Sequence, residues 1–243
     1  TVAKSCIQDR TLIEDPEIFA KYLHGLGYMD SRELDLYFEY FHKLDEASPK
    51  FTVFEMGKTE MGKSQIGAII TSPDNMKRLD RYKDIATRLA LAKGLDDEAA
   101  QKLASEGKSV VYIDGGLHAA ECAPAQALSE LAYDLITDED ADTRTILDNV
   151  VLLLCFANPD GMELVTNWYM RKPVQEERST DGLPRLYNWY VGHDNNRDAY
   201  MNNLSETENM SRILYREWFP QIMYNPHQTG PVGTVVFVPP FRD

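Results

Sequence analysis

The sequence is poor in cysteine, contains no long apolar run and carries no excess of positive charge. Its three cysteines (Cys6, Cys122 and Cys155) are odd in number and lack the spacing of a metal site, so they do not fix the compartment. No window holds 18 or more uninterrupted apolar residues, so no membrane span is visible. The formal net charge of −14 argues against nucleic-acid binding and is consistent with simple solubility. No signal peptide opens the chain at Thr1, and the sequence leaves open whether a leader has been removed.

Length and composition are those of an ordinary globular chain. The 243 residues correspond to one large domain or slightly more, and they can bury a substantial core. Hydrophobic residues make up 43% and charged residues 26%, which are usual values for a soluble domain. Any specific function must therefore be found in individual motifs.

Hydrophobic patterning predicts alternating helices and strands. Residues 1–48 are expected to form a helical preamble, and residues 74–107 a helical surface insertion without identifiable chemistry. Strands are expected over 51–56, 65–71, 110–113, 149–156, 221–224 and 234–238, and helices over 15–23, 31–44, 76–93, 96–106, 124–136 and 205–218. The acidic run 138–142 is interpreted as a solvated loop, and residues 171–187 as a long surface loop.

One stretch combines a buried strand with residues that bind metals. The run 110–113 is β-branched and aromatic, and Gly115 and Gly116 after it allow a sharp turn. His118 and Glu121 follow in a loop beyond the carboxyl end of this strand, where open α/β sheets bind ligands. A catalytic zinc takes three protein ligands and leaves a fourth position for water, so this pair is interpreted as two of the three. The alternative is that His118 caps a turn and Glu121 caps the following helix.

Three further polar segments follow in order. Asn158-Pro159-Asp160-Gly161 comes after the apolar run 149–156 and has the composition of a turn. Asn196 and Arg197 lie in a polar loop, and His227 follows a short strand. Taken alone, Arg197 is better explained by a surface salt bridge with Asp194 or Asp198.

Together these motifs resemble those of the zinc metallocarboxypeptidase family typified by pancreatic carboxypeptidase. The resemblance covers about residues 31–240 apart from 74–107, and the turn at 57–64 is similar to one that precedes the catalytic core of that family. The matching segments are His118-Ala119-Ala120-Glu121, Asn158-Pro159-Asp160-Gly161, Asp194-Asn195-Asn196-Arg197-Asp198, and His227 with Gly230. The implied fold is α/β, a mixed, largely parallel sheet flanked by helices on both faces, within a single catalytic domain.

The resemblance also implies roles for individual residues. One zinc ion per chain would be held by His118, Glu121 and His227. Asn196 and Arg197 match the pair that binds the C-terminal carboxylate of the substrate, which an arginine fork can bind through two hydrogen bonds.

A second arginine is assigned in the same way. Arg171 resembles the arginine that stabilises the developing oxyanion beside the metal, and Lys172 and Arg178 compete with it for this role. His193 lies close to the Asn-Arg pair and is a candidate for lining the cleft.

The implied function is hydrolysis of C-terminal peptide bonds in peptides or proteins by a metal-activated water. The family resemblance favours a secreted or periplasmic location. The sequence departs from the family pattern at one point: the glutamate that takes the proton of the water, and a substrate-capping tyrosine, lie in that family well after the third zinc ligand. This chain stops at Asp243, sixteen residues past His227. We expect a fragment of a longer enzyme that lacks the C-terminal strands and helix, rather than a catalytically crippled chain.

Two rival functions stay open at this point. An N-acyl amino-acid amidohydrolase of the aspartoacylase type resembles this metal site but lacks the 158–161 turn. A peptide-binding pseudo-enzyme would keep the carboxylate clamp without the base.

Overall fold

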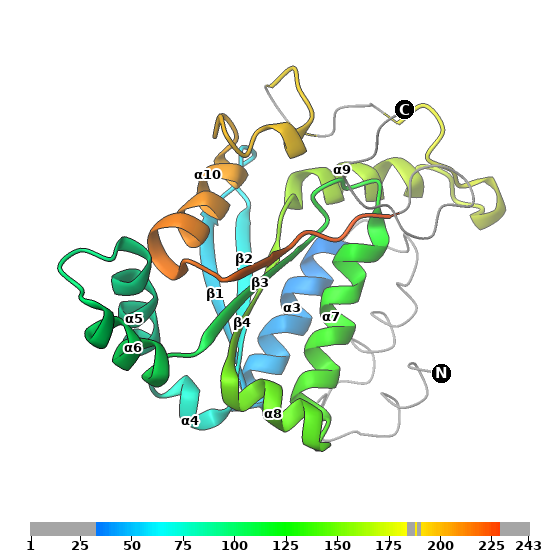
Figure 1. Ribbon diagram of the computed structural model, residues 1–243. Helices are drawn as coiled ribbons and strands as arrows, with labels where there is room; N and C mark the ends of the chain where they lie inside the picture. The colour runs from blue at the N-terminus through cyan, green and yellow to red at the C-terminus, as the bar shows by residue number, and fades with distance from the viewer. Residues whose placement is uncertain (1–32, 184–187, 189–190, 229–243) are drawn as a thin grey trace, which may run out of the picture.

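The computed structural model describes residues 33–183, 188 and 191–228, which form a three-layered α/β arrangement (Figure 1). The expected helix over 15–23 and strand over 234–238 lie outside the described residues, as do most of the helical preamble and Gly230. Within the described part of the chain, no helix is long and apolar enough to cross a membrane.

The described helices and strands alternate along most of the chain. The helices are α3 (Glu33–Ala47), α4 (Pro73–Met76), α5 (Leu79–Leu91), α6 (Asp97–Glu106), α7 (Cys122–Thr137), α8 (Ala141–Asn149), α9 (Pro159–Met170) and α10 (Ser205–Arg212). The strands are β1 (Phe51–Lys58), β2 (Ser64–Ile70), β3 (Ser109–Gly115), β4 (Val150–Phe156) and β5 (Ile222–Tyr224). One helical turn covers Asn195–Arg197, and α10 continues into a π-helical segment, Ile213–Trp218.

The described strands form one mixed sheet in the order β1-β2-β4-β3-β5. β3 is parallel to both of its neighbours, β4 and β5, whereas β2 is antiparallel to both β1 and β4. Four of the five described strands therefore run in the same direction, which confirms the predicted mixed, largely parallel sheet. Because β4, β3 and β5 are parallel, their carboxyl ends meet at one edge of the sheet.

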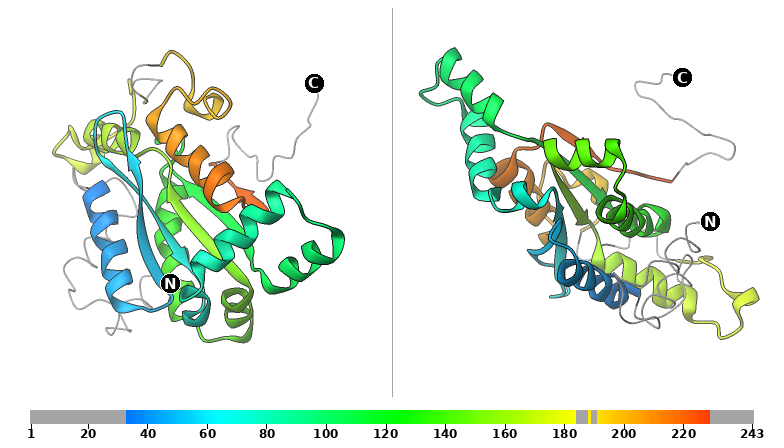
Figure 2. Two further views of the ribbon diagram at one scale, coloured as in Figure 1. Left: turned by 90° about the vertical axis from the view of Figure 1, so that its left-hand side faces the viewer. Right: turned by 90° about the horizontal axis from the view of Figure 1, so that it is seen from below.

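The sheet separates two hydrophobic cores. In β4 the side chains of Leu152, Leu154 and Phe156 enter one core, and those of Leu153 and Cys155 enter the other. This alternation follows from the two-residue period of a strand that is buried on both faces. Helices α3, α7 and α9 cover the first face, and α5, α6 and α10 the second, as Figures 1 and 2 show.

Two helices were not expected from the sequence. The acidic run at 138–142 is not a solvated loop throughout: Asp140 caps α8 by accepting hydrogen bonds from the backbone N–H groups of Asp142 (2.8 Å) and Thr143 (3.0 Å). The segment 158–161 is not a free turn either, because Asn158 caps α9 and Pro159 is its first residue. In both places the residue that caps the helix is of a type that is also common in turns, so the sequence before the helix resembles a turn.

The stretch 74–107 is helical, as expected, but the expected helix 76–93 is interrupted at residues 77–78, between α4 and α5. Figure 2 shows α5 and α6 extending beyond the sheet at one side of the molecule. Their inner faces are nevertheless part of the second core, where Tyr82, Ile85 and Leu103 are buried. That this stretch is an insertion stays a prediction.

Candidate metal centre

The candidate ligands lie beyond the carboxyl ends of two paired strands. β3 ends at Gly115 and β5 at Tyr224, and each is followed three residues later by a histidine, His118 or His227. A side chain at position 115 would place its Cβ 2.7 Å from the carbonyl oxygen of Pro124, so only glycine at this position lets the chain pass this close to α7. Parallel pairing of β3 with β5 therefore brings residues far apart in sequence to one edge of the sheet.

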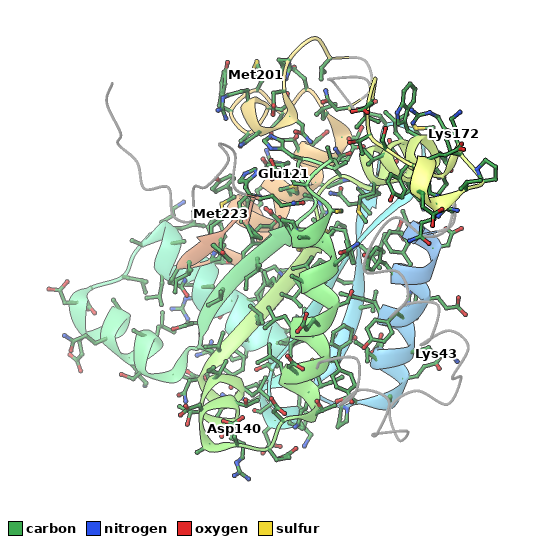
Figure 3. All side chains as sticks on the ribbon, turned by 90° about the vertical axis from the view of Figure 1, so that its right-hand side faces the viewer. Lys43, Glu121, Asp140, Lys172, Met201 and Met223 are labelled. Carbon is green, nitrogen blue, oxygen red and sulfur yellow. The ribbon has the colours of Figure 1, made fainter. Side chains whose placement is uncertain are left out.

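Three side chains at this edge form a cluster that could hold a metal ion. One potential ligand atom from each of His118, Glu121 and His227 lies within 4.8 Å of the others. Glu121 is in the middle: its Oε1 is 2.9 Å from His118 Nδ1, and its Oε2 is 2.9 Å from His227 Nδ1. The two imidazole rings are 4.6 Å apart between centroids. Figure 3 shows Glu121 at the edge where the strands end, opposite Asp140.

The donor set fits zinc. Two imidazole nitrogens and one carboxylate are a ligand set of catalytic zinc sites, which leave a position open for water. Both histidines direct the same ring nitrogen, Nδ1, toward the shared carboxylate. The two histidines therefore contact the two oxygens of one carboxylate, and the three side chains form a single cluster.

Asp194 supports the cluster from outside it. Its Oδ1 lies 3.0 Å from His118 Nε2, on the far side of the ring from Glu121, and accepts a hydrogen bond from the backbone N–H of Asn196 (2.8 Å). Burial raises the pKa of Asp194, but the bonds from Asn196 and His118 outweigh burial and the pKa is lowered overall. A carboxylate on the second nitrogen fixes the ring orientation and leaves Nδ1 for the metal. Asp194 belongs to the motif 194–198, but its contact with His118 was not predicted from the sequence.

The loop that carries His227 is attached to the start of α7. The backbone N–H of Gln228 donates to Glu121 Oε2 (3.0 Å), and the Gln228 side chain accepts from the backbone N–H of Ala123 (3.2 Å). Burial raises the pKa of Glu121, but the bonds from His118, Gln228 and His227 lower it by more. Glu121 is therefore held as a carboxylate by the residues around it.

Two buried asparagines hold the turn before His118. The side-chain amides of Asn158 and Asn195 both donate to the backbone oxygen of Leu117. Asn158 comes from the start of α9 and Asn195 from the turn after Asp194. The residue before the first candidate ligand is thus fixed from two separate segments.

Asn196, the first residue of the expected carboxylate-binding pair, lies beside the cluster. Arg197 follows Asn196 in the same helical turn. Asn196 Nδ2 is 3.5 Å from His227 Nε2. Arg197 is exposed, and its guanidinium donates to the backbone oxygen of Asn196 at 3.2 Å.

The neighbouring aspartates are engaged elsewhere. Asp194 contacts His118, and the fully buried Asp198 contacts His193 (2.7 Å) and accepts from the backbone N–H of Leu204 (2.9 Å). Among the described residues, neither aspartate forms a salt bridge with Arg197, although the charge of Arg197 helps to lower the pKa of Asp194. His193 thus binds the carboxylate that organises this loop.

Arg171 is placed differently from the other expected site residues. It follows α9, and its guanidinium donates to the backbone oxygens of Trp168 (2.6 Å), Ser179 (3.1 Å) and Asp181 (3.1 Å). It also stacks 4.2 Å from the ring centroid of Trp168. Figure 3 shows its neighbour Lys172 to one side of Glu121. The structure brings together His118, Glu121, His227 and Asn196, whereas Arg171 is bonded within its own loop.

Comparison with known proteins gives a consistent result. A family model described as zinc carboxypeptidase matches residues 37–224. Among solved structures, carboxypeptidase A from Helicoverpa armigera aligns at 15% identity and a TM-score of 0.49, over 95% of this chain and 54% of that one. Thrombin activatable fibrinolysis inhibitor aligns at 14% identity and a TM-score of 0.47, over 84% of this chain and 51% of that one. The chain therefore spans about half the length of these structures. No curated protein sequence matches the chain.

Proposed function

Because the chain belongs to the zinc carboxypeptidase family, we propose that it is a zinc-dependent carboxypeptidase that hydrolyses the C-terminal peptide bond of peptides or proteins. The observation that carries the proposal is the convergence of one atom each from His118, Glu121 and His227 within 4.8 Å. The chain spans about half the length of similar structures, so the activity proposed is that of the whole protein. A secreted or periplasmic location belongs to the same proposal and rests on the family alone.

In this proposal His118, Glu121 and His227 hold one zinc ion. Zinc in such a site polarises a carbonyl group and lowers the pKa of a bound water toward neutrality. Asp194 keeps the imidazole of His118 turned so that Nδ1 faces the site, and Gln228 keeps Glu121 directed toward both histidines. These contacts support a site that is held in place before metal and substrate arrive.

Asn196 and Arg197 are proposed to bind the substrate carboxylate. Asn196 adjoins His227, and Arg197 lies next to it with its guanidinium exposed. An exposed guanidinium without a carboxylate partner among the described residues can bind a substrate carboxylate through two parallel hydrogen bonds. Binding the free end of the chain beside the metal would restrict cleavage to the last peptide bond.

Arg171 is proposed to stabilise the oxyanion, as the family resemblance implies. This role requires its guanidinium to exchange the carbonyl partners of its own loop for the substrate. The proposal therefore predicts that the loop rearranges around Arg171 when substrate binds.

A matched pair of peptides, incubated with the whole protein, tests the proposal. One peptide ends in a free carboxylate and the other, of identical sequence, ends in an amide, and mass spectrometry follows the release of the last residue. We expect release from the free peptide only, and its loss in Arg197→Ala and after chelation. Arg216→Ala, which removes an exposed arginine from the segment after α10, serves as the charge-matched control and should leave release unchanged.

The other outcomes separate the rivals. Turnover of N-acyl amino acids but not of peptides would favour an amidohydrolase. Zinc-dependent binding of the free peptide without release would favour a pseudo-enzyme. Cleavage of both peptides at equal rates would contradict the carboxylate clamp.

A further inference from the structure

A buried aspartate interrupts the apolar pattern of the central strand β3. Asp114 follows Val110 and Tyr112 on the same face, and all three side chains are 0% exposed. Burial raises the pKa of Asp114 to about 7, and hydrogen bonds from Asn225 and Tyr112 oppose this effect. A carboxyl group in this position disfavours folding at neutral pH in comparison with an apolar side chain. Stability alone therefore does not account for an aspartate at position 114.

One hydrogen-bond partner of Asp114 lies at the end of the neighbouring strand. Asn225 Nδ2 donates a hydrogen bond to Asp114 Oδ1. Asn225 directly follows β5, which is an edge strand among the described strands and has three residues, each with a side chain more than half exposed. With so little packing, β5 depends on backbone pairing with β3 and on polar side-chain contacts at its ends.

The Asp114–Asn225 bond connects the two segments that lead to the histidines. Asp114 precedes His118 by four residues, and Asn225 precedes His227 by two. The last paired residues of the two strands are Ile113 and Tyr224, so the bond is formed one position further along in the same register. A shift of β5 along β3 would break this bond and displace His227 relative to His118.

We propose that Asp114 and Asn225 are a positioning pair that holds the third zinc ligand in register with the first. This role rests on the zinc site of the proposed function. The pair does not touch the metal: it sets the relative position of the two loops from inside the sheet. A residue that acts on the site in this way is expected to change zinc affinity more than it changes the stability of the fold.

The opposite end of β5 provides a matched control. There the backbone N–H of Val110 donates to Gln221 Oε1 (2.7 Å), and the backbone N–H of Gln221 donates to the oxygen of Val110 (2.9 Å). Gln221 therefore also attaches β5 to β3 through a polar side chain, but at the end far from His227. Removing its side chain weakens the same strand pairing without releasing the ligand loop directly.

The experiment measures the zinc dissociation constant by competition with a chelator, together with urea unfolding and the visible absorption spectrum of the cobalt-substituted chain. We expect Asp114→Ala and Asn225→Ala each to weaken zinc binding by about 10- to 100-fold and to alter the cobalt spectrum. Asp114→Asn keeps an oxygen acceptor and should stay within about threefold of wild type. Gln221→Ala should lower stability but also keep zinc affinity within about threefold. If Asp114→Ala does not fold, Asn225→Ala removes the same bond from its half-buried partner.

Each outcome decides the proposal. Wild-type zinc affinity in both alanine variants would overturn the positioning role and leave the zinc site intact. Equal losses of affinity in Asn225→Ala and Gln221→Ala would overturn it too, because β5 pairing in general would then be responsible. An absence of zinc from the folded wild-type chain would overturn the proposed function itself, and the positioning role with it.

Discussion

A carboxyl group outside the candidate metal centre offers a quantitative test of the structure. Glu206 lies in the first turn of α10 and is only 7% exposed. Its Oε1 accepts a hydrogen bond from the backbone N–H of Glu60 (3.3 Å), and its Oε2 is buried without a hydrogen-bond partner among the described residues. Asp160 adjoins it and itself accepts bonds from Thr59 Oγ1 (2.7 Å) and the backbone N–H of Met61 (2.9 Å).

These surroundings make the charged form of Glu206 unfavourable. Burial first, and then the nearby charge of Asp160, raise its pKa from the ordinary 4.5 to about 7. A carboxyl group whose pKa is raised by folding contributes its full stability below pH 4.5, and that stability is lost as the pH rises to about 7. At 1.36 kcal/mol per pH unit, the loss is about 3 kcal/mol at most.

Glu206→Gln removes the charge while keeping an oxygen that can accept from Glu60. We expect the free energy of unfolding of the variant to exceed that of wild type by up to about 3 kcal/mol at pH 8.5. At pH 4 the two values should be about the same. Urea unfolding at both values measures the difference. Glu208→Gln, an exposed acid two residues later on the same helix, is the matched control and should show no such pH dependence. Equal stability of wild type and Glu206→Gln at pH 8.5 would refute this account of the Glu206 site.

Three further predictions concern the fold and the candidate centre. Asn158→Ala removes the α9 cap and one of the two donors to Leu117, and should lower the unfolding free energy by about 1–2 kcal/mol in urea; an unchanged value would contradict the capping role. Asp194→Ala should weaken zinc binding by about 10- to 100-fold in chelator competition, through the loss of the carboxylate on His118, and unaltered affinity would show that this contact is dispensable. Phe41→Ala should cost about 3–5 kcal/mol in the same urea assay, because the ring is fully buried; a cost below about 1 kcal/mol would contradict its place in the core.

Much of the sheet could be predicted because its strands are continuous apolar runs. β4 places Leu153 in one core and Leu154 in the other, so every position is apolar and the run stands out from its surroundings. The ends of helices were harder to predict. Asp140 and Asn158 are side chains that cap a helix as readily as they form a turn, and the choice depends on what the following residues pack against.

The parts of the candidate centre that lie close together in the sequence could be predicted, and the contacts between distant segments could not. His118 and Glu121 are separated by one turn after a strand, a pattern visible in the sequence alone. The contacts of Asp194 with His118 and of Asp114 with Asn225 join segments that are distant along the chain. Such pairs depend on strand order and on loop positions, which hydrophobic periodicity does not specify.

The central claim is that His118, Glu121 and His227 hold one zinc ion, and metal content tests it most directly. Zinc is assayed in the purified chain, in Glu121→Gln and His227→Ala, and in His42→Ala as a control for the loss of an exposed histidine. We predict about one zinc per chain in wild type and His42→Ala, and its loss in the other two variants. A well-folded wild-type chain without zinc, or full retention of zinc in His227→Ala, would contradict the claim.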